Sequence, residues 1–488
     1  MPPTIENNHM NNTVNTSVLL GMAALLLAGC AAIPPDAHAP VRRDVATAEL
    51  AAGIHLAREG WPQAQWWTAY NDAQLNALMT KALQDGPSLE VAAARIGSAR
   101  SELSRSMADM GIDVTGYANA NRQRYSGTGL FPAPIGGAYF TTETLKLEAR
   151  YNFDWWGRNR AQVAAAVGAL NVDRAAYAEA EQALAAAIAQ SYFRLQGDFA
   201  RQENLAQMSS AQTALAQDQA RRIAGGLANL DAGHAAQAEL AQLRKQQAQL
   251  ATDIGVEREA LRALLGADHA ALADLKPVTV AAAPHTLPAR LGIDLLARRP
   301  DLQAARWKLE ASVSRIDAAK AAFYPDINLT GAIGLDTIKL ENLLQAASRT
   351  VYLGPTLTLP VFDSRRLDAQ LDGARTARDE RIAEYNQAIV EAVREVAQDA
   401  LQVQGIEQQI AEQDAATAAT NAQLASARAR FARGLADNGK VLTAQLAVLR
   451  QRDADLYLQQ VQRLAEIALT NALGGGYHEQ APLASAIK

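Results

Sequence analysis

The stretch Leu145-Lys-Leu-Glu-Ala-Arg-Tyr-Asn-Phe-Asp154 alternates apolar and polar side chains without a break. A period of two residues predicts a β-strand, because successive side chains of a strand point to opposite faces of a sheet. One face carries leucine and aromatic side chains, and the other carries the polar residues Lys146, Glu148, Arg150 and Asn152. We therefore expect a sheet with one apolar and one water-facing surface.

This strand, predicted over 140–154, has a partner just before it in the chain. Residues 112–124 precede it across the Gly- and Pro-rich loop Ser126–Gly137, which predicts a hairpin. A second pair of alternating stretches is predicted further along, over 326–336 and 349–361. Pro355 lies inside the last stretch, and because proline cannot donate a ladder hydrogen bond, an edge strand or a bulge is expected there.

One predicted helix precedes each hairpin and two long helices follow it. In the first copy these helices are predicted over 88–110, 157–223 and 233–265, and in the second over 301–323, 365–432 and 440–473. The first long helix would measure roughly 100 Å at ~1.5 Å per residue, too long to bury itself in one globular core. The three–four spacing of Ile389, Val393, Val396, Ala400 and Val403 is typical of a coiled-coil seam.

The same order of elements occurs twice because the chain is a tandem repeat. The sequences around Pro87, Asp113, Gly226 and Gly266 recur about 210 residues later, around Pro300, Asp326, Gly434 and Gly474. The predicted units are a signal peptide (1–29), an N-terminal segment (30–71), a first repeat (72–276), a linker (277–287), a second repeat (288–476) and a tail (477–488). The predicted class is α+β and mainly helical.

Cys30 is the single cysteine and ends the sequence Leu27-Ala-Gly-Cys30, directly after an apolar stretch of signal-peptide length. These residues resemble a bacterial lipobox, which implies cleavage before Cys30 and acylation of its thiol and amino group. Ala31 in place of Asp implies, by the same resemblance, sorting to the outer membrane. A buried cysteine beside an ordinary signal peptide is the alternative.

Composition excludes several function classes. The 46 basic and 51 acidic residues give a net charge of −5, so no electrostatic footprint for nucleic acid is present. Gly434 to Val441 nearly spells a phosphate-binding loop, but Val441 replaces the magnesium-ligating hydroxyl and the segment follows a helix. The seven histidines are scattered and the one cysteine is assigned to lipid. We expect no enzyme, no catalytic residues, no metal site and no cofactor other than that lipid.

Four strands per chain are too few to close a barrel, since the smallest membrane barrels have about eight. An open sheet edge is not tolerated in lipid, so an outer-membrane protein with such a sheet must complete it with further copies of the chain. Three chains would supply twelve strands and a bundle of long helices. The sequence thus predicts a homotrimer with its polar strand faces toward a lumen.

Several longer motifs resemble the TolC-type outer-membrane factors, specifically their OprM/NodT-like lipoprotein branch. The motifs are Trp66-Trp-Thr-Ala-Tyr-Asn-Asp-Ala-Gln-Leu75, Leu295-Leu-Ala-Arg-Arg-Pro-Asp-Leu302, Ala318-Ala-Lys-Ala-Ala-Phe-Tyr-Pro-Asp-Ile-Asn-Leu329 and Leu359-Pro-Val-Phe-Asp363. The resemblance implies a homotrimeric conduit with a 12-stranded barrel in the outer membrane and an α-helical barrel in the periplasm. It also implies service as the exit duct of a tripartite efflux system with a periplasmic adaptor and an inner-membrane RND pump.

The resemblance further implies that the turns between the long helices form a periplasmic tip that is gated and docks the adaptor. The tip residues expected here are Gly226, Leu227, Asp231, Gly434, Leu435, Asp437 and Lys440. Glycine ends a helix because it adopts left-handed backbone angles cheaply, and the adjacent leucine offers an apolar knob. Lys440 occupies the place where family members often carry an acidic residue, and Asp437 and Asp231 are its expected substitutes.

Two alternatives share much of this architecture. One is the outer-membrane duct of a type I protein secretion system. The other is a trimeric coiled-coil lipoprotein that conducts nothing. The lipobox and the Trp66-Trp67 region favour the RND branch, while the sequence carries no signal for a particular cargo.

Overall fold

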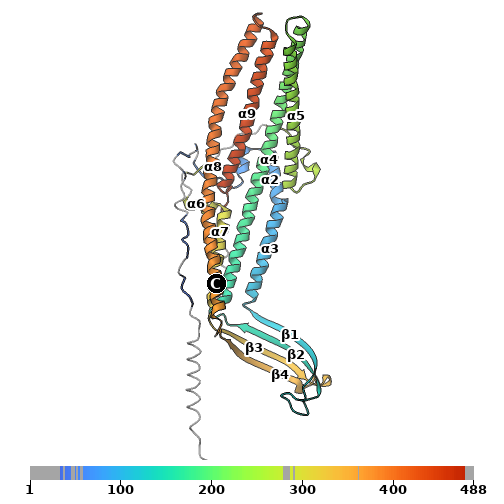
Figure 1. Ribbon diagram of the computed structural model, residues 1–488, viewed down its shortest axis with the longest axis vertical. Coiled ribbons are helices and arrows are strands. Elements are labelled where there is room, and N and C mark those ends of the chain that lie inside the picture. Colours follow the sequence, from blue (N-terminus) through green and yellow to red (C-terminus); the bar gives the residue numbers. More distant parts are fainter. Residues whose placement is uncertain are drawn as a thin grey trace, which may run out of the picture.

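A computed structural model describes residues 33–36, 39–44, 50, 53, 54, 56, 59–278, 286–288, 292–360 and 362–478. Long helices run side by side along most of the molecule, and a four-stranded sheet continues from one end of them (Figure 1). The predicted mainly helical α+β class is confirmed. The predicted signal peptide (1–29), Cys30 and most of the predicted tail lie outside the described residues.

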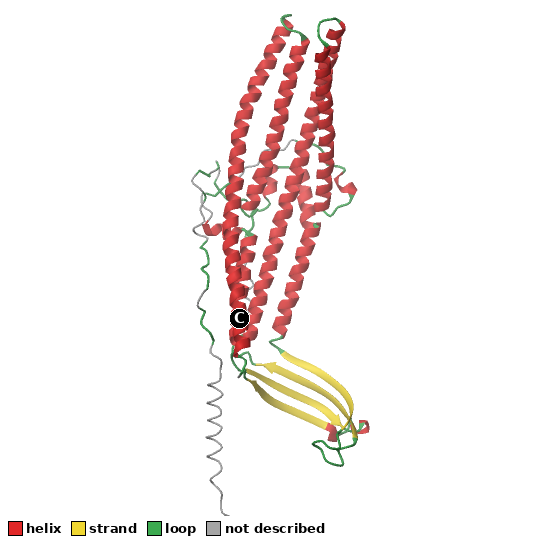
Figure 2. Ribbon diagram, in the orientation of Figure 1, coloured by secondary structure: helices red, strands yellow, loops and turns green. Residues whose placement is uncertain are grey.

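Each repeat contributes two helices, a hairpin and two long helices, which is one helix more before each hairpin than the sequence predicted. The first contains α2 (Ala73–Asp85), α3 (Pro87–Ala108), β1 (Ile112–Arg124), β2 (Tyr139–Asn152), α4 (Arg158–Ala224) and α5 (Leu230–Leu264). The second contains α6 (Gly292–Arg298), α7 (Pro300–Ala321), β3 (Asp326–Thr337), β4 (Arg349–Thr358), α8 (Ser364–Ala432) and α9 (Asn438–Ala472). The turns between the long helices lie at the end opposite the sheet (Figure 2).

Several element boundaries differ from the predicted ones, two of them because polar caps were overlooked and one because of a proline. Strand β2 ends at Asn152 instead of 154, since the Asp154 carboxylate accepts hydrogen bonds from the first backbone amides of α4. Helix α5 begins at Leu230 instead of 233 because Asn229 caps it. Strand β4 ends at Thr358 instead of 361, just before Pro360, which has no amide to pair.

The two long helices α4 and α8 are 67 and 69 residues long and are stabilised by packing against their neighbours. Helix α4 packs against α3, α5, α7 and α9, while α8 packs against α7 and α9. The predicted seam of α8 is confirmed, because Ile389, Val396, Ala400 and Val403 are buried and Val393 packs at its margin. Burial of these side chains stabilises helices that would fray if isolated.

Small residues set the spacing between α4 and α7. A Cβ on Gly168 would lie 2.8 Å from the Cβ of Ala311, a distance that real Cβ atoms do not reach. Only glycine at position 168 allows the two helix backbones to approach this closely. This close approach agrees with the alanine-rich seams of the sequence and joins the first repeat to the second.

The sheet is antiparallel with strand order β1-β2-β3-β4. Leu147 on β2 pairs with Gly116 on β1 and with Ile333 on β3. The ladder between β2 and β3 joins the two hairpins into one sheet. Strands β1 and β4 are left as open edges. Pro355 lies on β4, so the edge position predicted from the sequence is confirmed.

No described helix combines enough length and enough apolar character to serve as a membrane span.

Candidate functional site

The polar side chains predicted on one face of β2 lie together. Lys146 Nζ is 2.9 Å from Glu148 Oε2, and Arg150 Nη2 is 3.5 Å from Glu148 Oε1. Asn152 Nδ2 donates to Asp326 Oδ1 of β3 at 3.0 Å. We call this surface the polar face of the sheet. Its charged groups are partnered with one another, so it presents a wet surface without a strong net charge.

The opposite surface, which we call the apolar face, is exposed in the single chain. Leu147 on β2, Ile333 on β3 and Val351 on β4 form one cross-strand row, and their exposed fractions are 57%, 62% and 76%. Leu145 and Leu353 continue it and are also exposed. A contiguous apolar surface of this kind marks contact with lipid or with another protein.

The two edge strands leave unpaired backbone groups. Strands β1 and β4 each pair on one side only, and both carry exposed apolar side chains, such as Val114 and Leu353. An edge of this length is a template for pairing with another strand. Because β1 and β4 run antiparallel to each other, the β4 edge of one copy can continue the ladder with the β1 edge of the next.

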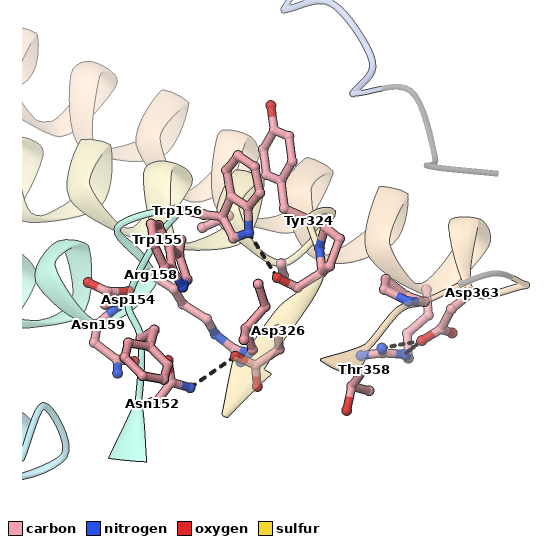
Figure 3. A pocket seen from close by; sticks show the side chains of 17 residues that line it. Asn152, Asp154, Trp155, Trp156, Arg158, Asn159, Tyr324, Asp326, Thr358 and Asp363 are labelled. Carbon is pink, nitrogen blue, oxygen red and sulfur yellow. Dashed lines mark hydrogen bonds and ion pairs between the residues drawn. The ribbon is translucent and has the colours of Figure 1, made fainter. Parts of the chain in front are cut away.

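The junction between sheet and helices contains a pocket of about 290 Å³ (Figure 3). The rings of Trp156 and Tyr324 stack with centroids 4.4 Å apart, and Trp156 Nε1 donates to the Pro325 carbonyl at 2.8 Å. Trp155 remains 65% exposed. Trp156 therefore packs at the junction, while the ring of Trp155 contacts that of Phe153 with centroids 6.1 Å apart.

Both turns between long helices have the same glycine-centred geometry. Gly226 has φ +70° and Gly434 has φ +72°, a region that favours glycine. The Leu227 amide donates to the Arg222 carbonyl at 2.7 Å, and the Leu435 amide donates to the Arg430 carbonyl at 2.9 Å. Together with the i→i−3 bonds of the glycine amides, these form Schellman motifs that satisfy the last helix carbonyls.

Two leucines project from these turns into solvent. Leu227 is 75% exposed and Leu435 is 73% exposed, although each is large and apolar. Their repetition at both turns makes an apolar knob at the tip of each helix pair. We call the two turns with their leucines the tip.

The acidic tip residues differ in their surroundings. Asp437 caps α9 by accepting a hydrogen bond from the Lys440 amide, and its Oδ2 lies 2.5 Å from Arg222 Nη1 on α4. The Arg222 guanidinium, with the Lys440 amide, lowers the pKa of the Asp437 carboxyl. Asp231 lies in the first turn of α5, which is capped by Asn229 instead. The sequence predicted Asp437 as a tip residue but gave no indication of its pairing with Arg222.

An N-terminal strap, residues 33–44 with the exception of 37 and 38, runs along α8. Ile33 packs beside Phe323 and Leu367 near the sheet, and Asp36 pairs with Arg378. Asn386 Nδ2 donates to the Val41 carbonyl at 3.0 Å. The strap begins three residues after Cys30 at the sheet end of the helices, a feature that sequence reasoning missed because its contacts lie about 300 residues away along the chain.

Known proteins share both the sequence and the shape of this chain. Residues 78–267 and 291–475 match the family described as outer membrane efflux protein. The putative multidrug resistance outer membrane protein MdtQ of Shigella flexneri is 35% identical over 462 residues, which cover 93% of this chain and 96% of MdtQ. The multidrug resistance outer membrane protein MdtP of Escherichia coli (strain K12) is 35% identical over 460 residues, 93% of this chain and 94% of MdtP.

A solved structure agrees with the fold. The outer membrane protein VceC of Vibrio cholerae superimposes with a TM-score of 0.78 and 31% sequence identity, over 86% of this chain and 100% of VceC. The family match spans both repeats, with the hairpin and the long helices of each. The chain is a member of the outer membrane efflux protein family and is an outer-membrane protein.

Proposed function

We propose that three copies of this chain form an exit duct through the outer membrane, with the sheets closed into a 12-stranded barrel and the long helices extending into the periplasm. The observation that carries this is the four-stranded sheet with two open edges, one exposed apolar face and one polar face. Closure would remove the edges from lipid, turn the apolar face outward and line a lumen with Lys146, Glu148, Arg150 and Asn152.

The duct would serve a tripartite efflux system, receiving drugs or other small toxic compounds from an inner-membrane RND pump through a periplasmic adaptor. The names of MdtQ and MdtP as multidrug resistance outer membrane proteins support this substrate class. No chemical step is required of the duct, because the pump supplies the energy. A protein secretion duct remains the alternative with the same architecture.

The tip would be the gate and the adaptor's docking site. Leu227 and Leu435 are exposed apolar side chains on the turns between the long helices, at the end opposite the sheet (Figure 1), where a helical adaptor could bury them. Gly226 and Gly434 hold the turns that present them, with Asp231, Asp437 and Lys440 alongside. Buried apolar anchors of this kind dominate the free energy of protein–protein binding.

Cys30 would carry the lipid that anchors the chain to the inner leaflet of the outer membrane. The strap supports this, since its Ile33 is held at the sheet end of the helices, only three residues from Cys30. At ~3.3 Å per extended residue, the acyl chains would start within about 10 Å of Ile33. More than one acyl chain is needed for lasting attachment.

Conductance of the purified full-length protein in planar bilayers, together with its native mass, tests the duct. Three chains and stable ion-conducting channels are expected. A stable monomer or dimer would overturn the architecture, and a trimer that never conducts would favour the coiled-coil stalk. Co-purification of an ABC exporter in place of an RND pump would favour the secretion duct.

The docking role is tested by Leu435→Asp in a strain that relies on this duct for drug resistance. A carboxylate cannot be buried cheaply without a partner, so adaptor affinity should fall roughly tenfold or more and resistance should fall with it. Leu344→Asp is the matched control, because Leu344 is 85% exposed in the loop at the opposite end of the molecule. Normal resistance of Leu435→Asp at normal trimer levels would limit the leucine to a helix-cap contact.

A further inference from the structure

The apolar face of the sheet ends in arginines at its loop end. On β1, every second residue from Ile112 to Ala120 is apolar or glycine, and the next two positions on the same face are Arg122 and Arg124. On β4, the same face runs from Leu357 through Val351 to Arg349. The ladders are continuous in register, so these three arginines lie on the apolar face and not on the polar face.

The height of Arg122 on β1 matches the outer boundary of a membrane. Arg122 lies about ten residues beyond Ile112, which is about 33 Å along a strand at ~3.3 Å per residue. With the ~40° tilt of barrel strands this becomes about 25 Å, the height of the apolar band of outer-membrane barrels. The loop between β1 and β2 lies at the end of the sheet farthest from the helices, and hence on the outer side (Figure 1).

The arginines of β1 contact neighbouring groups, but none of the three arginines pairs with an acidic side chain among the described residues. The Arg122 guanidinium lies 5.6 Å from the centre of the Tyr139 ring, and Arg124 Nε donates to the Gly137 carbonyl at 3.2 Å. Arg122, Arg124 and Arg349 are all exposed. Within the part of the chain that the structure describes, none of these three side chains forms an ion pair with a carboxylate.

A carboxylate oxygen that accepts no hydrogen bond belongs to a residue of the same face. Glu143 of β2 pairs in register with Ala120 and is only 8% exposed, and its Oε2 has no hydrogen-bond partner among the described residues. A buried carboxylate oxygen without a donor is unfavourable. The three arginines of this face outnumber this one carboxylate, so an occupant of the face should bring a negative charge.

Arginines of both edge strands lie along the same seams of the closed barrel. The inference rests on the proposed trimer, in which β4 of one copy pairs with β1 of the next. Arg349 of one copy then reaches the same seam as Arg122 and Arg124 of its neighbour. Each of the three seams would carry three arginines, with one carboxylate, Glu143, on the adjacent strand β2.

We propose that these seams bind the phosphate groups of a phosphorylated glycolipid in the outer leaflet. Guanidinium groups bind phosphate bidentately and strongly, and the sugar of such a lipid carries the phosphates at the level of its headgroup. The acyl chains of the same lipid cover the apolar face below the arginines. This polar contact above the apolar band fixes the position of the barrel along the membrane normal.

The test measures binding of three probes to the detergent-purified full-length protein. The probes are a bisphosphorylated lipid A, the same lipid with both phosphates removed, and vesicles of phosphatidylglycerol. Wild type should bind the bisphosphorylated lipid at least tenfold more tightly than either other probe. Equal binding of the dephosphorylated lipid, or of phosphatidylglycerol, would overturn the glycolipid site.

The protein variants locate the site. R122Q/R124Q/R349Q should bind the bisphosphorylated lipid at least tenfold more weakly, and the three Arg→Lys changes should restore part of the affinity. Arg150→Gln on the polar face removes the same kind of charge and should leave binding unchanged. Wild-type affinity in the triple variant would overturn the proposal.

Native mass and bilayer conductance of the same samples separate this proposal from the duct itself. A conducting wild-type trimer that binds all three probes equally refutes the glycolipid site and leaves the duct intact. A protein that neither trimerises nor conducts refutes the duct and with it the seams.

Discussion

Arg222 of α4 and Asp437 at the start of α9 form an ion pair that joins the two repeats at the tip, with Arg222 Nη1 2.5 Å from Asp437 Oδ2. The same carboxylate caps α9 by accepting from the Lys440 amide at 3.0 Å. One side chain thus ends the turn of the second repeat and holds it to the first. Any widening of the tip between these two helices must break this contact.

Removing the charge while keeping the cap should loosen the tip. Asparagine is as good an N-cap as aspartate, so Asp437→Asn should preserve α9 and lose only the ion pair. We expect a higher open probability in planar bilayers for Asp437→Asn and for Arg222→Gln, and no further increase when the two are combined. Independent, additive increases would contradict a shared contact, because uncoupled sites add.

The pH dependence of this contact follows from the direction of the pKa shift. Arg222 lowers the pKa of the Asp437 carboxyl, so the pair is fully formed above the usual aspartate value and is lost as pH falls through the lowered one. Conductance of wild type should therefore not respond to this pair between pH 5 and 8. Opening near neutral pH that disappears in Asp437→Asn would contradict this assignment.

The sequence predicted the strands and long helices well because period-two and three–four patterns report directly on burial. Leu145 and Leu147 alternate with Lys146 and Glu148, and the structure keeps them on opposite faces. The seam residues Ile389 and Val396 are buried for the same reason.

Contacts between distant segments could not be predicted from such patterns. The pair Arg222 and Asp437 lies across the two repeats, and Asp36 pairs with Arg378 of α8. Neither pair has a local signature, because the spacing of one element does not say which side chain of another will face it. Two helix starts were predicted too late for a simpler reason. Asn229 and Asp437 are N-caps, but in the sequence they look like any other polar residue of a loop.

Replacing Gly434 should strain the backbone without causing a steric clash. Its φ of +72° is unfavourable for other residues, while a Cβ there would meet no atom within 4 Å. Gly434→Val should therefore destabilise the turn by about 1–2 kcal/mol per chain and reduce efflux, with trimer and membrane insertion intact. Thermal unfolding and susceptibility assays would measure the two effects.

Gly405→Ala is the matched control for that substitution. Gly405 lies within α8, where a Cβ also meets nothing within 4 Å and φ is not positive. Alanine there should stabilise the helix by roughly 0.5–1 kcal/mol. An equal loss of stability in both variants would show that the left-handed backbone of Gly434 is not the cause.

Lipid attachment at Cys30 should be visible by metabolic labelling with palmitate. Wild type should be labelled, and Cys30→Ala directed through a cleavable signal should not be. The barrel should still hold this variant in the outer membrane, so its trimer level should remain within about twofold of wild type. An unlabelled wild type would refute the lipobox interpretation.

Asp399 of α8 provides a test of pH-dependent stability in the helical region. Burial, followed by the nearby charge of Glu395, raises the pKa of its carboxyl to about 6, against the opposing effect of Arg394 and Arg299. The folded protein therefore retains this proton between the unfolded value of 3.8 and about 6, where the unfolded chain has lost it. The contribution to stability is fully present below the unfolded value and is lost as pH rises through 6.

Asp399→Asn removes this pH dependence because asparagine cannot ionise. We expect the variant to unfold at a higher temperature than wild type at pH 7.5, with the difference shrinking as pH falls toward 4, since both side chains are then neutral. Glu412→Gln, at an exposed position of the same helix, should shift the unfolding temperature little at either pH. A constant difference between Asp399→Asn and wild type across this pH range would mean that the carboxyl is ionised throughout, and that Arg299 and Arg394 outweigh burial and Glu395.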